Sequence, residues 1–178
     1  MAPSSRAAPD RIVWVVDLLD ITPDDQILEF GCGSGVAVAL VADRLVAGTI
    51  TAIDRSATAI ERARARNAEH IAAGRAVLQH VALADFHGEP GHYTKAFAVN
   101  VNVFWTSPAD AECQVLSRML KPGGAIRLVY DGPAPGSGRD VHAAVAANLQ
   151  RHGFATTVTH GPDNTMVCVT GQVDEQPT

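Results

Sequence analysis

The chain has 178 residues, a length that fits one domain with a substantial core. Its formal net charge of −5 argues against a nucleic-acid partner, which would normally recruit a basic surface. The three cysteines are scattered along the chain, so we expect neither a disulfide framework nor a zinc site. No run approaches the roughly 20 apolar residues of a membrane span, and we therefore expect a cytoplasmic protein with no membrane partner.

The first part of the chain is predicted to contain a helix, a strand and a second helix. Residues 1–8 are small and polar and are expected to be mobile, and Asp10 is placed to cap an N-terminal helix over residues 9–20. Residues 26–30 form an apolar run typical of a buried strand. The apolar stripe after the strand predicts a helix over residues 36–47.

Strands and helices alternate along the rest of the chain. Further strands are predicted at residues 49–54, 76–83, 95–101, 125–130, 154–160 and 165–172. Helices are predicted to follow Ser56, Ser107 and Asp140. The first should carry Ile60, Ala63, Asn67 and Ile71 on its inner face, the second should have Pro108 as its first helical residue, and a flexible loop over 132–138 should precede the third. This order predicts an α/β fold in a single domain over residues 1–178. The fold is a doubly wound, Rossmann-like, seven-stranded and mostly parallel sheet, with an antiparallel C-terminal hairpin and helices on both faces.

The most informative stretch is the loop between the first strand and the second helix. Gly31, Gly33 and Gly35 alternate directly after the buried strand, and Glu29 lies within that strand. Glycines let the backbone turn tightly and approach a ligand closely, and the next helix presents free N–H groups to a nucleotide-like molecule. A dinucleotide-binding loop would need G-x-G-x-x-G, and this spacing departs from it.

Four polar or glycine-rich stretches come directly after predicted parallel strands. They are the glycine loop, Asp54, Asp85-Phe86, and the segment from Asn100 to Trp105. Since ligands of doubly wound sheets bind at the carboxyl ends of the strands, we expect these stretches to meet in one crevice. Taken singly, Asp54 and Asp85 would more simply be residues that cap turns.

In order, these motifs resemble the class I S-adenosylmethionine-dependent methyltransferases. The similarity lies in Glu29-x-Gly31-x-Gly33-x-Gly35, the acid that closes the second strand, the acid after the third, Lys121-Pro-Gly-Gly124 before the fifth, and the terminal hairpin. It extends over about residues 10 to 172. The resemblance implies S-adenosylmethionine as the cofactor.

The resemblance also implies a role for individual residues. The loop residues Gly31, Cys32, Gly33 and Gly35, with Glu29, would hold the amino-acid part of the cofactor. Asp54 would accept from the ribose hydroxyls. Around the adenine, Arg55 would lie beside the ring, Asp85 would accept from its amino group, and the backbone N–H of Phe86 would bond the ring. Asn100 and the backbone of Val101 would line the cofactor near its methionine end.

The implied reaction is in-line transfer of a methyl group, in which positioning of the acceptor supplies much of the catalysis. A general base is needed only for an acceptor that enters protonated. The candidates by location are His87, His92, Tyr130 and Asp131. No metal is expected, because the neutral Asn100 and Asn102 stand where metal-dependent relatives cluster carboxylates.

The acceptor is less well specified by the sequence. Candidate substrate-binding residues are Asn102, Phe104, Trp105, Trp14 and Arg11. For Phe104 and Trp105, packing in the core is as good an explanation as contact with the substrate, and for Trp14 packing is the better explanation. We expect a small-molecule acceptor, bound by short loops or in a pocket that a second copy of the chain completes as a homodimer. The alternatives are a non-catalytic cofactor-binding or partner module, an RNA or protein methyltransferase and, more remotely, an NAD-dependent oxidoreductase.

Overall fold

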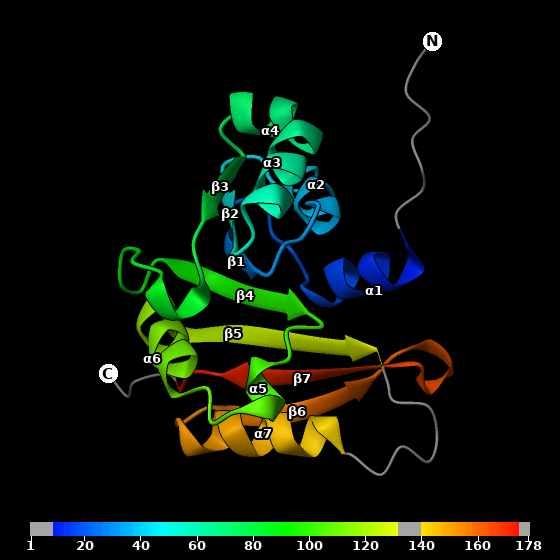
Figure 1. The fold of residues 1–178 in the computed structure, drawn as a ribbon, viewed down its shortest axis with the longest axis vertical. Helices are drawn as coiled ribbons and strands as arrows, with labels where there is room; N and C mark the ends of the chain where they lie inside the picture. Colours follow the sequence, from blue (N-terminus) through cyan, green and yellow to red (C-terminus); the bar gives the residue numbers. More distant parts are fainter. Residues whose placement is uncertain (1–8, 132–139, 175–178) are drawn as a thin grey trace.

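The computed structural model describes residues 9–131 and 140–174, so the segments 1–8 and 132–138, for which the sequence predicts mobility, lie outside the described residues. The described chain forms a seven-stranded sheet with helices on both faces (Figure 1). The strands are β1 (Gln26–Phe30), β2 (Thr49–Asp54), β3 (Ala76–His80), β4 (Tyr93–Val99), β5 (Leu120–Asp131), β6 (Ala155–His160) and β7 (Met166–Gln172). The helices are α1 (Asp10–Leu18), α2 (Val36–Ala42), α3 (Ala57–Arg66), α4 (Ala68–Ala72), α5 (Val103–Thr106), α6 (Asp110–Met119) and α7 (Val141–Arg151), with 3₁₀ turns η1 (Leu83–Asp85) and η2 (Pro162–Asn164).

The strand order places a crevice at the carboxyl ends of the central strands. The order is β3-β2-β1-β4-β5-β7-β6, and β1 to β5 run parallel while β7 is antiparallel to both β5 and β6. The chain moves outward from β1 in one direction and from β4 in the other. The carboxyl ends of β1 and β4 therefore mark the switch point at which such sheets bind ligands. The predicted fold class is confirmed.

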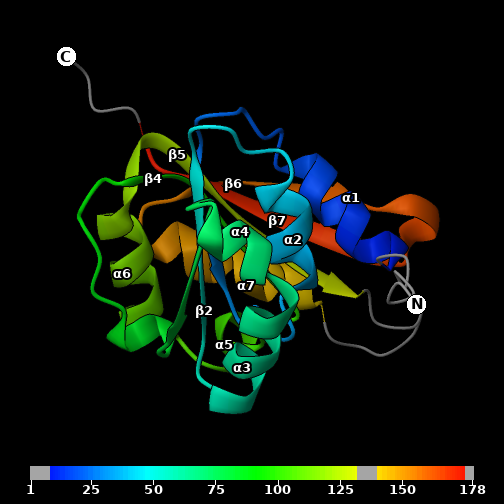
Figure 2. The ribbon, with the colours of Figure 1, turned by 90° about the horizontal axis from the view of Figure 1, so that it is seen from above.

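Two hydrophobic cores lie against strand β1, one on each face of the sheet. Figure 2 shows α1 and α2 apart from α6, with strands of the sheet between them. Ile27 packs with residues of α1 and α2, whereas Leu28 and Phe30 pack on the opposite face with residues of α6 and α7. Because successive side chains of a strand point to opposite faces, Glu29 lies on the face of Ile27. It is 3% exposed, so the sequence buries a carboxyl group directly beneath the glycine loop.

Helix α2 starts from Gly35, whose φ of 73° belongs to the left-handed region. A Cβ at this position would lie 2.6 Å from Nδ2 of Asn67 and 2.9 Å from Cβ of Ala63, so α3 packs directly against the loop. The buried amide of Asn67 donates hydrogen bonds to the carbonyl groups of Gly35 (3.0 Å) and Ala63 (2.9 Å). The glycine is therefore required by packing between helices as well as by its backbone conformation.

Three expectations about helices are wrong. The simplest correction is that α2 ends at Ala42 and not at residue 47. The helix after Ser56 is interrupted at Asn67, so Ile71 lies on the separate helix α4 and is 37% exposed instead of buried. The Ser56 cap itself is confirmed, because its hydroxyl accepts a hydrogen bond from the Ala59 N–H (3.2 Å). A side chain that bonds the last carbonyls of a helix, as that of Asn67 does, competes with continuation of the helix.

The third correction concerns the start of α6, which is at Asp110 and not at Pro108. The hydroxyl of Ser107 donates to the carbonyl of Val103 (3.0 Å) and so closes the short helix α5, which the sequence did not predict. Ala109 then adopts a left-handed conformation, with φ of 53°, and the chain turns into α6. The third strand is also shorter than expected, since it ends at His80 and the chain continues into η1.

None of the described helices is long and apolar enough to cross a membrane.

Candidate cofactor and active site

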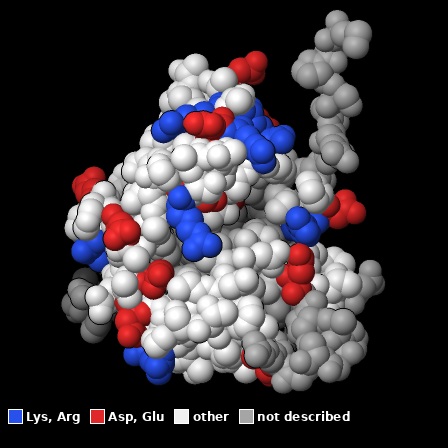
Figure 3. Space-filling view, in the orientation of Figure 1, with Lys and Arg blue, Asp and Glu red and all other residues white. Residues whose placement is uncertain are grey.

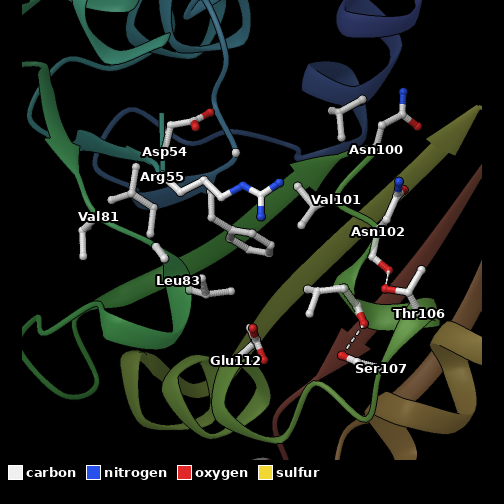
Figure 4. Close-up of a pocket in the computed structure, with 16 residues that line it drawn as sticks. Asp54, Arg55, Val81, Leu83, Asn100, Val101, Asn102, Thr106, Ser107 and Glu112 are labelled. Carbon is white, nitrogen blue, oxygen red and sulfur yellow. Dashed lines mark hydrogen bonds between the residues drawn. The ribbon is translucent and has the colours of Figure 1, made fainter. Parts of the chain in front are cut away.

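A cavity of about 590 Å³ lies at the carboxyl ends of β1, β2 and β4 (Figure 4). This volume is within the range of small-molecule binding sites, roughly 300 to 1,000 Å³. Its lining residues among the described part of the chain are Phe30, Gly31, Ile53, Asp54, Arg55, Val81, Ala82, Leu83, Val99, Asn100, Val101, Asn102, Val103, Thr106, Ser107 and Glu112. Three of the four stretches expected to meet in one crevice contribute to this lining, and Asp85-Phe86 does not. Six predicted site residues line the cavity, namely Gly31, Asp54, Arg55, Asn100, Val101 and Asn102.

Asp54 joins the glycine loop to the start of α3. One carboxylate oxygen accepts a hydrogen bond from the N–H of Gly33 (2.9 Å), and the other accepts one from the N–H of Ser56 (2.8 Å). Asp54 thus performs the turn-capping role that the sequence allowed. A carboxylate oxygen has more than one lone pair, so both oxygens can still accept from a ligand in the cavity.

Gly33 differs from Gly35 in having open space where its Cβ would be, since nothing lies within 4 Å of that position. Its φ is +54°. The N–H of Gly33 is used by Asp54, and the space beside its Cα is the kind of close approach that a ligand requires of a glycine loop. Gly33, Gly35 and Cys32 are not among the cavity-lining residues of the described chain.

Glu29 is the least satisfied polar group near the site. Its Oε2 atom is buried and has no hydrogen-bond partner among the described residues. Burial raises the pKa of this carboxyl to about 8, with a further contribution from the nearby negative charge of Asp54. The carboxyl is therefore largely protonated at pH 7, and a cationic group placed beside it would favour its ionised form.

Cys32 comes shortly after Glu29 in the same buried region. Burial, and then the negative charges of Glu29 and Asp54, raise the pKa of its thiol to about 12. Since the thiol is 7% exposed and neutral at physiological pH, it packs as a small apolar side chain.

The opposite side of the switch point is fixed by hydrogen bonds between the ends of β4 and β5. Asn100 has a left-handed φ of 56°, which asparagine tolerates better than most residues. Its amide donates to the carboxylate of Asp131 (2.8 Å) and accepts from the Asp131 N–H (3.0 Å). Arg11 of α1 forms an ion pair with the same carboxylate (3.3 Å). Arg11 and Asp131 therefore flank the cavity without lining it.

The four candidate bases all lie outside the cavity lining. Tyr130 is buried, its hydroxyl donates to the carbonyl of Val101 (2.9 Å), and burial raises its pKa above the usual value. His92 lies beside Glu89 (3.6 Å) and against the ring of Tyr93, and His87 is exposed. Asp131 and Tyr130 each bond a residue that lines the cavity, Asn100 and Val101 respectively. A role as base stays a prediction for each of them.

The third-strand side of the cavity is lined by Val81, Ala82 and Leu83, and Asp85 and Phe86 do not take part. The 3₁₀ turn explains the difference, because residues three apart face the same way. Leu83 and Phe86 are both buried, at 8% and 2% exposure, and Asp85 points to solvent. The binding roles of Asp85 and Phe86 remain predictions that this geometry does not favour.

Of the candidate acceptor-binding residues, Asn102 lines the cavity and the aromatic ones do not. Phe104 is fully buried against Phe30 (5.8 Å between ring centroids), which is the core role that the sequence left open. Trp105 packs partly on the same core, and its indole N–H donates to the side chain of Asn102 (3.2 Å). Trp14 packs near Gly161 of the β6–β7 hairpin, 3.3 Å from where a Cβ there would be.

Three polar lining residues were not predicted from the sequence: Thr106, Ser107 and Glu112. Thr106 is the last residue of α5, Ser107 follows it, and Glu112 lies in the first turn of α6 (Figure 4). An acid in the first turn of a helix is ordinary, so no local pattern distinguishes Glu112. Its position over the cavity results from how α6 packs.

Within residues 9–131 and 140–174, no group of three or more His, Cys, Asp or Glu side chains is arranged to hold a metal ion.

The comparisons with known proteins agree with this geometry. Residues 27–124 match the model of a family described as methyltransferase domain. The chain belongs to this family. The membership confirms the predicted resemblance, with S-adenosylmethionine as the cofactor of the domain and methyl transfer as its class of chemistry.

A curated relative is the ribosomal protein L11 methyltransferase of Cupriavidus taiwanensis, 33% identical over 129 residues. The match covers 71% of this chain and 38% of the relative, so the chain spans well under half of the relative's length.

Solved structures show the same fold at low identity. A SAM-dependent methyltransferase from Aquifex aeolicus superposes with a TM-score of 0.78 at 14% identity, over 93% of this chain and 94% of that one. The cyclase SpnF also gives a TM-score of 0.78, at 16% identity, over 98% of this chain and 86% of that one. Because a cyclase shares the fold, the family match and the site residues carry the functional argument.

The residues present fit the cofactor in two respects. The buried, unpartnered Oε2 of Glu29 is an acceptor that a cation would compensate, and the open side of Gly33 leaves room for a ligand. Glu29 itself is not among the described residues that line the cavity. When bound, S-adenosylmethionine supplies a methyl group on a positively charged sulfur that is a good leaving group.

Proposed function

We propose that this chain transfers the methyl group of S-adenosylmethionine to a small-molecule acceptor by in-line displacement, mainly through positioning. The observation that carries the proposal is the cavity at the carboxyl ends of β1, β2 and β4, with the glycine loop and Asp54 on one wall. A site that holds two reactants in one geometry makes their encounter effectively intramolecular, which is worth several orders of magnitude in rate.

The donor half of the site consists of residues that bind and orient. In this proposal, Glu29 pairs with the ammonium group of the cofactor and becomes ionised as it does so. Asp54 accepts from the ribose hydroxyls while its bonds to the N–H groups of Gly33 and Ser56 keep the carboxylate in place. Two fixed carboxylate oxygens suit two adjacent hydroxyls. Preorganisation of Asp54 reduces the ordering cost of binding.

The acceptor half lies between the ends of β4 and β5. Asn100 and Asn102 line the cavity here. The side chain of Asn100 bonds Asp131 through both its amide nitrogen and its oxygen, and the oxygen of Asn102 accepts from Trp105, which leaves the Asn102 NH₂ group as a donor for the acceptor molecule. Asp131 bonds the lining residue Asn100 and its carboxylate can accept a proton, whereas burial raises the pKa of Tyr130 and favours its protonated hydroxyl. We therefore propose Asp131 ahead of His87, His92 and Tyr130 as the base where one is needed. Phe104 has no part in this half, because it is fully buried.

The charge of the protein favours a small acceptor over a nucleic acid. On the face shown in Figure 3, the Lys and Arg side chains are interspersed with Asp and Glu instead of forming one basic surface. The net charge of −5 points the same way. A cytoplasmic location and a homodimer complete the proposal.

Methylation of a protein is the second candidate, and the name of the curated relative favours it. The two candidates differ in what must enter the cavity, since a protein acceptor would present one flexible side chain or terminus. A non-catalytic cofactor-binding module is the third possibility, and it predicts binding without turnover.

The proposal is tested by calorimetric binding of S-adenosylhomocysteine and then by turnover. Purified protein is incubated with S-adenosylmethionine and either a metabolite extract or a proteome digest, and transfer is monitored by mass spectrometry. The proposal expects S-adenosylhomocysteine to form with the metabolites and the mass of one metabolite to increase by a methyl group. Methylated peptides would favour the second candidate. Binding with no turnover in either mixture would favour the module, and binding of NAD in place of S-adenosylhomocysteine would revive the oxidoreductase alternative.

A further inference from the structure

The cavity has a second charged wall that none of the sequence motifs accounts for. Its described lining includes three ionisable side chains, Asp54, Arg55 and Glu112. Asp54 and Arg55 are at the end of β2, and Glu112 faces them from α6 on the other side of the cavity (Figure 4). We infer that Glu112, and not Asp85, recognises the exocyclic amino group of the cofactor's adenine. This inference rests on the proposed function.

The direction of the cofactor is set by the order of the strands. The glycine loop and Glu29 are at the end of β1, and Asp54 is at the end of β2, the next strand of the sheet. A nucleoside whose sugar lies at Asp54 and whose amino-acid part lies at the glycine loop has its base on the far side of Asp54. That space is the one lined by Val81 and Leu83, beside Arg55.

The walls of this space suit a flat, largely apolar ring. Ile53, Val81, Leu83 and Val103 supply apolar surface, and the side chain of Arg55 extends into the cavity (Figure 4). A guanidinium group stacks well on an aromatic face. To bind adenine, such walls also need a hydrogen-bond acceptor for the amino group of the base.

Glu112 is the cavity-lining acceptor on this side. A carboxylate only accepts hydrogen bonds, which matches an amino group and opposes a carbonyl oxygen. The neighbouring hydroxyls of Thr106 and Ser107 use their protons on the carbonyls of Asn102 (2.9 Å) and Val103 (3.0 Å). The Ser107 oxygen also accepts from the Ala109 N–H (3.3 Å), so it keeps one lone pair for a ligand, and the Thr106 oxygen is a further acceptor. This part of the cavity is therefore rich in acceptors, as the recognition of an amino group requires.

Asp85, the residue expected from the motif, is less well placed. It is exposed and does not line the cavity, because it lies on the outer side of the turn η1. Helix α6 packs against that same turn, which brings Glu112 to the space that Asp85 does not reach.

The position of Glu112 is also fixed from behind by α7. His152 lies 2.9 Å from the carboxylate of Asp110, at the start of α6. The side-chain amide of Asn148 donates to the carbonyls of Phe104 (2.7 Å) and Ser107 (2.9 Å). The first turn of α6 and the α5–α6 turn are therefore held in place, which is what precise recognition of one group needs.

The test compares two ligands that differ at this group. S-adenosylhomocysteine carries the amino group, and S-inosylhomocysteine carries an oxygen in its place. Their dissociation constants are measured by calorimetry for the natural protein, for Glu112→Gln and for the matched control Asp85→Asn. The melting temperature of each protein verifies that it is folded.

We expect the natural protein to prefer S-adenosylhomocysteine. In Glu112→Gln, the new amide can donate to the inosine oxygen, so the preference should shrink by at least about tenfold. Asp85→Asn should leave the preference unchanged.

Three results would overturn the inference. A preference that collapses in Asp85→Asn alone would return the role to Asp85. Equal weakening of both ligands in Glu112→Gln would mean that Glu112 serves Arg55 or the fold instead of the base. If the natural protein binds neither ligand, the proposed function fails, and the inference fails with it.

Discussion

The two walls of the cavity are built in different ways. On the wall formed by the glycine loop and the end of β2, backbone N–H groups of Gly33 and Ser56 converge on one side chain, Asp54. On the wall formed by α5 and α6, side chains of α7 hold the backbone, with Asn148 bonding two carbonyls of the α5–α6 turn. The first wall is determined by residues within about one β-α-β unit, and the second depends on a helix much later in the chain. Substitutions on each wall should therefore differ in how far their effects reach.

The largest effect is expected for Gly35→Ala on the first wall. The new Cβ would lie 2.6 Å from Nδ2 of Asn67 at a φ of +73°, so overpacking and backbone strain should together reduce the free energy of unfolding by about 2 to 4 kcal/mol. Urea denaturation measures the loss. Gly74→Ala is the matched control, because its φ is +74° with nothing within 4 Å, and it should cost only about 1 kcal/mol. Equal losses for the two variants would show that the side chain of Asn67 can move to accommodate the new Cβ.

The second effect is expected for Asp54→Ala, which removes the acceptor of both loop N–H groups. Affinity for S-adenosylhomocysteine should fall by about 100-fold, because two ligand hydroxyls and the preorganised loop lose their partner. Calorimetry measures the loss, with Asp43→Asn as a control at an exposed acid at the end of α2. An affinity that stays within about threefold of the natural protein would exclude Asp54 from the ribose site.

The sequence predicted the first wall well because its determinants are local. A strand that ends in glycines and a strand that ends in Asp54 are both visible within short windows, and the structure places Gly31 and Asp54 at one cavity. The seven strands were predicted from apolar runs and turn residues in the same way.

The second wall escaped prediction because its determinants are distant in sequence. The local pattern predicts Ser107 as the cap of the next helix, but its hydroxyl closes α5. The motif assigns Asp85 to the cofactor, but the 3₁₀ turn directs it to solvent, and no spacing rule connects Glu112 to the cavity. The unpartnered carboxyl of Glu29 shows a further limit of prediction from sequence. The sequence predicts that the strand is buried, but not that burial raises the pKa of this carboxyl.

A third, smaller effect tests whether the second wall really depends on α7. Asn148→Ala removes the amide that bonds the carbonyls of Phe104 and Ser107. The variant should lose about 1 to 2 kcal/mol of stability, because two carbonyls lose their partner, and bind S-adenosylhomocysteine several-fold more weakly. Gln150→Ala is the control on the same helix, where the side chain bonds the hydroxyl of Thr156 instead. It should leave the affinity unchanged. Equal affinity in the two variants would indicate that α5 and α6 hold their own geometry.

The smallest effect is a pH dependence that originates beneath the first wall, at Glu29. In the free protein this carboxyl has a pKa of about 8, above its ordinary value of 4.5. Its protonated form therefore stabilises the fold fully below pH 4.5, and that stabilisation is lost as the pH rises through about 8. A ligand ammonium group favours the ionised form, so binding of S-adenosylhomocysteine releases a proton, and the affinity should rise about fivefold between about pH 7 and pH 8 and level off above that.

Calorimetry across this range, with Glu29→Gln as the control, separates the contribution of this residue from titration of the ligand's own amino group. The variant has no carboxyl to ionise, so its affinity should change with pH only as the ligand titrates. It should also bind more weakly than the natural protein above about pH 8, where the ion pair is complete. If both proteins showed the same rise, the ammonium group would have to bind elsewhere. The buried, unpartnered Oε2 atom would then reduce the stability of the fold, and the ligand would not compensate this loss.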